Sequence, residues 1–112
     1  MAAFFRKRAT GERELAARRI AQLREEVPQL AAILRAHGAR RVWLFGSLAW
    51  GQPDVHADID LAVEGMPPAA YFGALGELLL RASASVDLVA LEDIPEGFAR
   101  RIRESGLEIE AP

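Results

Sequence analysis

The first third of the chain carries apolar residues at the spacing of one helix face. Thr10 is a suitable N-terminal cap, since its hydroxyl can accept a hydrogen bond from a free backbone N–H of the first turn. Pro28 interrupts the pattern and predicts either a kink or a second helix that begins there. Gly38 predicts the helix stop. We interpret the apolar face as a core face, with a partner-binding seam as the alternative; it consists of Ala16, Ile20, Leu23, Val27, Leu30 and Leu34.

Later segments have the pattern of β-strands. Residues 41–45 are apolar on both faces, which is typical of a central strand. Residues 58–63 alternate between apolar and other side chains, which predicts a strand with one buried face. Residues 86–91 predict a third strand, and residues 107–110 predict a short strand at the sheet edge.

Prolines and glycines mark two further helices. Pro67 and Pro68 open a helix that runs to about Arg81, and Pro95 starts a last helix that Gly106 ends. Helices and strands therefore follow one another in a mixed order along the chain. This order predicts an α+β fold, a small mixed β-sheet with helices packed on one side.

Length and composition then narrow the class of protein. With 112 residues, 51% of them hydrophobic, the chain fits one globular domain, which we assign to residues 10–112. We expect residues 1–9 to be a flexible tail, although Phe4 and Phe5 could instead dock on a partner. No apolar run approaches the roughly 18 residues of a membrane span, so we expect no membrane partner. The absence of Cys excludes disulfides and thiolate metal sites and fits a cytoplasmic protein.

Charge is distributed unevenly along the chain. The overall net charge is −2, but residues 1–41 carry a net +6 and residues 42–112 a net −8. A basic first third could meet nucleic acid, a nucleotide phosphate or an acidic partner. We prefer the simpler interpretation, that the arginines solvate the outer face of a helix, and expect no direct binding to nucleic acid.

Two aspartates stand at the head of the second predicted strand. Asp58 and Asp60 share one face of that strand, about 7 Å apart at their Cα atoms. Carboxylates that converge to ~5 Å repel each other by roughly 3 kcal/mol at an effective dielectric constant near 20. A divalent cation such as Mg²⁺ would relieve that repulsion. Asp87 is a lone acid in the third strand, and beside Asp58 and Asp60 it would complete a cluster able to hold two metal ions.

The turn before these aspartates has the composition of an anion site. Gly46 follows the first strand and lets the backbone approach a ligand closely. Ser47 adds a hydroxyl, and a short helix beginning there would point free N–H groups at a phosphate. A phosphate-binding turn that faces a carboxylate–metal cluster is suited to transfer from a nucleoside triphosphate.

The aspartates also allow simpler interpretations. A calcium loop of the EF-hand type needs Gly at its sixth position, where counting from Asp58 gives Val63 and counting from Asp54 gives Ile59. That class is excluded. Taken alone, Asp58 and Asp60 could be surface acids. His56, in the loop before them, is interpreted as a solvated side chain without a role.

The stretch GSLAWGQPDVHADIDL, with Asp87 downstream, resembles the signature of the minimal nucleotidyltransferases of the DNA polymerase beta superfamily. The resemblance extends from about Arg41 to Glu110. It implies that Asp58, Asp60 and Asp87 are catalytic metal ligands for two Mg²⁺ ions, with Asp87 also the base towards the attacking hydroxyl. It implies that Gly46 and Ser47 hold the triphosphate of ATP.

The resemblance also implies a partner. Small relatives of this kind commonly serve as antitoxins of HEPN-type toxins, and some transfer AMP from ATP to a tyrosine of the toxin. We expect this activity and an assembly with such a toxin. The sequence ends at residue 112 without the extra domain of larger relatives, so the acceptor is expected on another macromolecule. An alternative is a subunit of an antibiotic-modifying nucleotidyltransferase.

The turn departs from the family pattern at two positions. Many relatives carry basic residues just after Gly-Ser, where this chain has Leu48 and Trp50. Arg40 or Arg41 could compensate for the missing charge, or Trp50 could stack on the base. A further alternative follows, in which the site is degenerate and the protein neutralises its toxin by binding alone.

Overall fold

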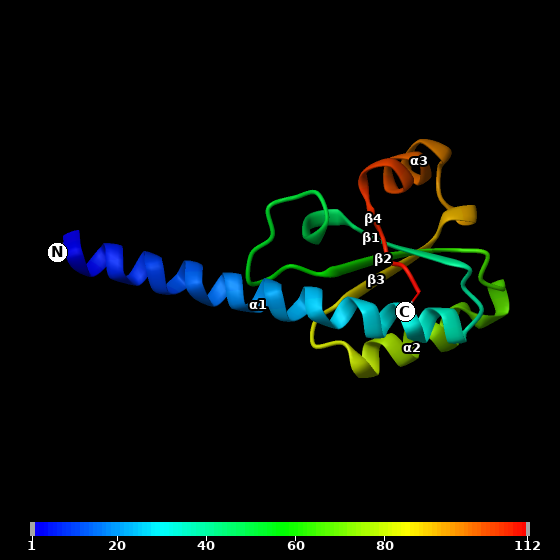
Figure 1. Cartoon of the computed structure of the whole chain (residues 1–112), viewed down its shortest axis with the longest axis horizontal. Helices are drawn as coiled ribbons and strands as arrows, with labels where there is room; N and C mark the ends of the chain where they lie inside the picture. The colour runs from blue at the N-terminus through cyan, green and yellow to red at the C-terminus, as the bar shows by residue number, and fades with distance from the viewer. Residues whose placement is uncertain (1, 112) are drawn as a thin grey trace.

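The computed structural model describes residues 2–111, and side chains from residue 11 onward. Four strands and three α-helices form an α+β structure (Figure 1). The α-helices are α1 (Ala2–Ala36), α2 (Tyr71–Arg81) and α3 (Glu96–Ser105). The strands are β1 (Arg41–Phe45), β2 (Ile59–Glu64), β3 (Val86–Ala90) and β4 (Leu107–Glu108). Three short 3₁₀ turns are η1 (Gly46–Leu48), η2 (Pro68–Ala70) and η3 (Leu91–Asp93).

Helix α1 is longer than the sequence predicted. It begins at Ala2 rather than at Thr10, and it continues through Pro28 without a new start. The Pro28 ring lies on the exposed side of the helix, while Val27 and Leu30 beside it are buried against the sheet. The apolar packing of these neighbours therefore outweighs the one backbone hydrogen bond that proline removes. The expected flexibility of residues 1–9 stays a prediction.

The end of α1 confirms the predicted stop. Gly38 has φ +103°, a left-handed conformation in which glycine carries no Cβ penalty. The N–H of Ala39 donates to the carbonyl of Leu34 at 3.0 Å, and the N–H of Gly38 donates to that of Arg35 at 3.0 Å. These two bonds satisfy carbonyls that the last helical turn leaves free.

The sheet is mixed, with the strand order β3-β2-β1-β4. β1 pairs antiparallel with both β2 and β4, whereas β2 and β3 run parallel. The α+β class and the mixed sheet are thereby confirmed. The crossover from β2 to β3 passes through α2, as a parallel pair requires. Its consequence for function is that β2 and β3 begin at the same edge of the sheet.

Helices cover both faces of the sheet, which corrects the expectation that all of them pack on one side. Helices α1 and α2 lie on one face, over a core that includes Ile59, Leu61 and Val63 of β2. Helix α3 lies on the other face, where Ala99 and Ile102 pack on residues of β1 and β2 (Figure 1). β1 is buried on both faces because each of its faces meets a helix layer.

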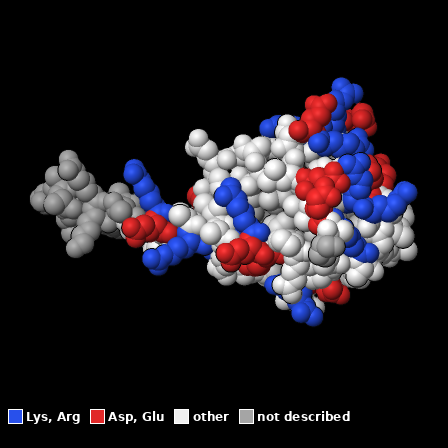
Figure 2. Space-filling view, in the orientation of Figure 1, with Lys and Arg blue, Asp and Glu red and all other residues white. Residues whose placement is uncertain are grey.

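Charged side chains gather unevenly on the surface. Figure 2 shows many of them over α3 and beside it, and others along the projecting part of α1. Within residues 2–111, no helix combines the length and the apolar character needed to cross a bilayer.

Candidate active site

The parallel pair β2–β3 brings two of the predicted aspartates side by side. Asp60 lies directly opposite Asp87 in the register of the two strands. Asp58 precedes β2 by one residue and shares the face of Asp60, because side chains alternate along an extended chain. Asp60 is half-buried, while Asp58 and Asp87 are exposed. The three carboxylates thus stand at one edge of the sheet, on the α3 face.

The three acids interact electrostatically. The pKa of Asp60 is raised to about 6 from an ordinary value of 3.8, and burial is the largest cause. The negative charges of Asp87 and Asp58 and a hydrogen bond with Asp87 contribute to this rise in the same direction. Each of these influences disfavours the ionised Asp60 carboxylate. A cation bound among the three carboxylates would offset the repulsion that Asp58 and Asp87 exert on the ionised Asp60 carboxylate.

The turn after β1 lies directly against this cluster. Phe45 of β1 lies opposite Asp60 of β2 in the antiparallel register, so the next residue, Gly46, lies beside the aspartates. Gly46 has φ +70°, and a Cβ atom built on it would lie 2.1 Å from Oδ2 of Asp60. This position therefore requires glycine for both its backbone conformation and its space.

The turn itself is closed by backbone hydrogen bonds. The N–H groups of Ala49 and Trp50 donate to the carbonyl of Gly46 at 3.0 and 2.9 Å, and that of Gly51 donates to Ser47 at 3.2 Å. A Cβ atom on Gly51 would lie 2.8 Å from Cα of Ser47, so this second glycine allows the turn to fold back on itself. The result is a compact backbone turn with Ser47 at its start.

A cavity of about 360 Å³ connects the turn to the aspartates. Ser47, Asp58 and Asp60, three of the candidate site residues, line it together, whereas Gly46 and Asp87 are not part of its wall. The remaining wall comes from the loop between η1 and β2, through Gln52, Pro53, Asp54, His56 and Ala57. Sequence reasoning gave this loop no role.

His56 reaches the cavity because of a local turn. The carboxylate of Asp54 accepts a hydrogen bond from the backbone N–H of His56 at 2.8 Å, which folds the loop towards β2. The Asp54-x-His56 spacing is the signal in the sequence that could have indicated this turn.

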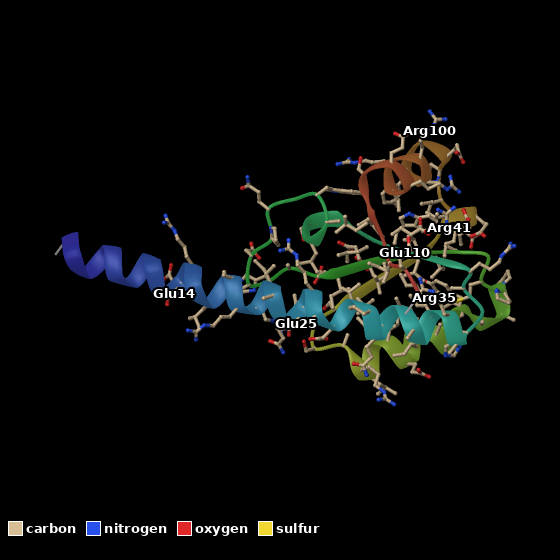
Figure 3. The ribbon with its side chains drawn as sticks, in the orientation of Figure 1. Glu14, Glu25, Arg35, Arg41, Arg100 and Glu110 are labelled. Atoms are coloured by element: carbon tan, nitrogen blue, oxygen red, sulfur yellow. The ribbon has the colours of Figure 1, made fainter. Side chains whose placement is uncertain are left out.

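Arg40 and Arg41 do not replace the missing basic residues of the turn. Arg41 pairs with Glu64, at the opposite end of β2 from the aspartates, and its guanidinium binds Glu108 at 2.6 Å. Figure 3 shows it far from the loop that lines the cavity. Arg40 lies against Gly65, just beyond that same end of β2.

Two other arginines border the turn. Nη2 of Arg24, from α1, donates to the carbonyl of Leu48 at 3.1 Å. The guanidinium of Arg101, from α3, lies 4.5 Å from the ring centroid of Trp50, whose ring also contacts Phe45. Neither arginine is near the turn in the sequence, so only the packing of α1 and α3 could reveal them.

The donor chemistry of the cluster suits a hard cation. Carboxylate oxygens are the ligands that Mg²⁺ prefers, and it commonly uses one or two of them together with substrate phosphates. The placement of Asp58, Asp60 and Asp87 at one edge of the sheet is the structural observation that favours such an ion. Among the residues whose side chains are described, no group of three or more His, Asp or Glu side chains is placed so that it could hold a metal ion by itself. The residues therefore fit an ion whose remaining ligands come from water and substrate.

The raised pKa of Asp60 predicts a pH-dependent effect on stability. The pKa of Asp60 is higher in the folded than in the unfolded state, so ionisation of this carboxylate lowers the free energy of unfolding. The loss is complete above about pH 6 and absent below about pH 4. In the presence of a chelator that removes divalent cations, Asp60→Asn is expected to raise the free energy of unfolding at pH 7.5. The expected gain is roughly 1 kcal/mol, after discounting for solvent screening. At pH 4 we expect little difference from the wild type.

Thermal unfolding at the two pH values checks this prediction. Glu104→Gln is the control, because Glu104 is an exposed carboxylate of α3 outside the cluster. An Asp60→Asn variant that is equally or less stable than the wild type at pH 7.5 would contradict the unfavourable charge at this position.

Comparisons with known proteins agree with this geometry. The sequence profile of the family described as "Polymerase beta, Nucleotidyltransferase" matches residues 28–110. No match is found among the curated proteins. The fold is similar to that of a candidate minimal nucleotidyltransferase, with a TM-score of 0.67 and 22% identity over 79% of this chain and 93% of that one.

Two toxin–antitoxin structures are also similar in fold. A chain of a toxin–antitoxin with AMP-PNP matches with a TM-score of 0.62 and 23% identity, covering 74% of this chain and 71% of that one. A chain of a tri-AMPylated Shewanella oneidensis HEPN toxin in complex with an MNT antitoxin matches with a TM-score of 0.57 and 21% identity, covering 75% and 68%. The profile match, the mixed sheet and the turn beside the acidic cluster together show that this chain belongs to the polymerase beta nucleotidyltransferase family.

Proposed function

We propose that this protein is a Mg²⁺-dependent nucleotidyltransferase that moves AMP from ATP to a hydroxyl group of a partner toxin. The acceptor is a tyrosine of a HEPN-type toxin, and the transfer makes the protein an antitoxin that acts in the cytoplasm. The observation that carries the proposal is the registered pair Asp60–Asp87 beside the Gly46–Ser47 turn. Similarity to structures of an AMP-PNP complex and of an AMPylated HEPN toxin supports the choice of nucleotide and partner.

In this proposal the acids divide the work by their position relative to the cavity, which Asp58 and Asp60 line and Asp87 does not. Asp58 and Asp60 would hold the cation, and Asp87 would complete its carboxylate set. When bound, Mg²⁺ supplies positive charge to the phosphate oxygens as a Lewis acid. Asp87 is exposed and lies outside the cavity wall, which leaves it accessible to a hydroxyl that arrives from a partner. It is therefore the group that takes the acceptor's proton.

The turn positions the other reactant. Ser47 and the backbone of the turn hold the triphosphate in the cavity that Asp58 and Asp60 also line. The acceptor oxygen forms a bond to the α-phosphorus of ATP, while the bond from that phosphorus to the bridging oxygen breaks. Pyrophosphate leaves, AMP stays on the acceptor, and the hydroxyl proton moves to Asp87.

A second candidate function is neutralisation by binding alone. The observation in its favour is the turn, where Leu48 is buried and Trp50 packs against Phe45, so that neither offers a charge to a phosphate. In this case the fold would persist as a binding module with a degenerate site. Neutralisation would then be independent of the aspartates.

Transfer of a label from ATP tests the proposal directly. ATP labelled at the α-phosphate is incubated with Mg²⁺, the protein and a lysate of the source cells, and proteins are separated by size. We expect one labelled acceptor whose label is released by a phosphodiesterase as AMP. Mass spectrometry of the labelled band identifies the acceptor and the modified residue.

The same incubation with Asp58→Asn/Asp60→Asn is the control for site-dependent labelling. If no label depends on these aspartates while the protein still captures a specific partner, the binding module replaces the enzyme as the function. Label on an aminoglycoside-like small molecule instead of a protein would point to a subunit of an antibiotic-modifying enzyme.

A further inference from the structure

The outward face of α2 is apolar, which is unusual for a surface helix. Phe72, Leu79 and Leu80 have 80%, 55% and 86% of their surface exposed, and Gly73 and Gly76 lie between them, also exposed. At 3.6 residues per turn these five positions fall within a sector of about 120°. The buried residues Ala74 and Leu78 lie on the opposite side, against the core. Helix α2 thus has an apolar face on both sides.

Helix α3 does not share this property. The exposed residues of α3 include Glu96, Arg100, Arg101 and Arg103, and Figure 2 shows charge concentrated there. On α2, the nearest charged groups lie at the margin of the face. The Glu77 carboxylate is 3.5 Å from His37, which directly follows α1, and Arg81 ends α2. An apolar surface framed by charge at its edges is typical of an interaction site.

The distribution of large and small residues makes this face complementary to itself. Gly76 lies at its centre, with Phe72 four residues before it and Leu80 four residues after it. If two copies of α2 cross antiparallel at Gly76, the Phe72 end of each helix meets the Leu79–Leu80 end of the other. Gly76 of each copy lies at the crossing and has no side chain, so the two backbones can approach closely. Within one copy, a Cβ atom at Gly76 would find nothing within 4 Å. Such a contact has the two-fold symmetry of most dimers.

We propose that this protein forms a two-fold symmetric dimer in which α2 of each copy packs antiparallel on α2 of the other, centred on Gly76. The inference is independent of the transfer reaction, because the face lies on the side of the sheet opposite the acidic cluster.

Charge at the ends of α2 favours the same pairing. An apolar cavity of about 510 Å³ adjoins the start of the helix and is lined in part by Phe72 and by the acids Glu92 and Asp93. The antiparallel crossing brings Arg81 from the end of the partner helix to this acidic border, and it does so twice. A parallel crossing would instead place Arg81 beside Arg81. A stable interface needs roughly 800 Å² of surface from each partner. The apolar wall of this cavity adds to the area that α2 contributes.

Cysteine cross-linking tests the geometry, because the chain contains no Cys of its own. Gly76→Cys places one thiol on the proposed symmetry axis, where it faces its own copy. Gly97→Cys is the matched control, a helical glycine of α3 that is equally open to solvent. Under mild oxidation we expect Gly76→Cys to form a disulfide-linked dimer at least ten times faster than Gly97→Cys. Equal rates would overturn the proposed dimer and assign the face to a different partner.

Sedimentation equilibrium supplies a measurement without a cross-link. The wild type is expected to associate with rising concentration, and Leu80→Glu is expected to weaken the dimer at least tenfold by placing a charge in the apolar contact. Leu15→Glu, at an exposed leucine of α1, is expected to leave the association unchanged. A wild type that stays monomeric up to several hundred micromolar would reject the proposal, as would equal effects of the two glutamates.

Discussion

Gly46→Ala is expected to abolish transfer activity and to lower the free energy of unfolding. The backbone at this position has φ +70°, which costs an alanine roughly 1–2 kcal/mol relative to glycine. The new Cβ atom would also lie 2.1 Å from Oδ2 of Asp60, far inside van der Waals contact. Either the turn or the carboxylate must move, and that displacement typically adds about 1–3 kcal/mol. Chemical denaturation measures the stability, and the labelled-ATP assay measures the activity.

Gly97→Ala is the control for a change of glycine to alanine in general. Gly97 lies in α3 with nothing within 4 Å of a Cβ atom, so alanine there is expected to stabilise the protein by up to about 1 kcal/mol. Activity should be unchanged. A Gly46→Ala variant as stable and active as Gly97→Ala would show that the turn and Asp60 are not in the contact described above.

The second large effect is expected at the acids themselves. Asp58→Asn/Asp60→Asn retains the size of both side chains but removes two negative charges, so the affinity for a divalent cation should fall steeply. Metal assistance commonly contributes several kcal/mol to phosphoryl transfer, so we expect the rate to fall by roughly 10³-fold or more. The circular dichroism spectrum and thermal unfolding should show an intact fold. The transfer rate as a function of Mg²⁺ concentration provides the measurement.

Asp54→Asn is the matched control for this change. Asp54 lines the same cavity, but its carboxylate binds the N–H of His56. We expect less than a tenfold loss of rate, because an asparagine oxygen can accept the same hydrogen bond.

Growth of cells that express the partner toxin separates the two candidate functions. Rescue that survives Asp58→Asn/Asp60→Asn would identify neutralisation by binding.

Much of the local structure was predictable from the sequence, because periodicity is a local property. Alternation in residues 58–63 predicted that Ile59, Leu61 and Val63 share one face, and all three lie in the core beneath α1 and α2. Gly38 ends its helix as predicted, with a positive φ angle. The start of α1 and its continuity through Pro28 were not predictable, because packing of neighbouring apolar residues decides whether a proline interrupts a helix.

Some features of the candidate site follow from the sequence, and others depend on the tertiary structure. The sequence by itself determined which residues are candidates for the chemistry, since a Gly-Ser turn and an Asp-x-Asp strand are short patterns along the chain. Only the tertiary structure decided that Asp60 lies opposite Asp87, that α3 covers the second face, and that the loop with His56 forms the cavity wall. It also decided that Arg24 rather than Arg41 borders the turn. Strand register and helix packing join residues distant in sequence, and the free energy that selects them comes from burial of the whole core rather than from any local pattern.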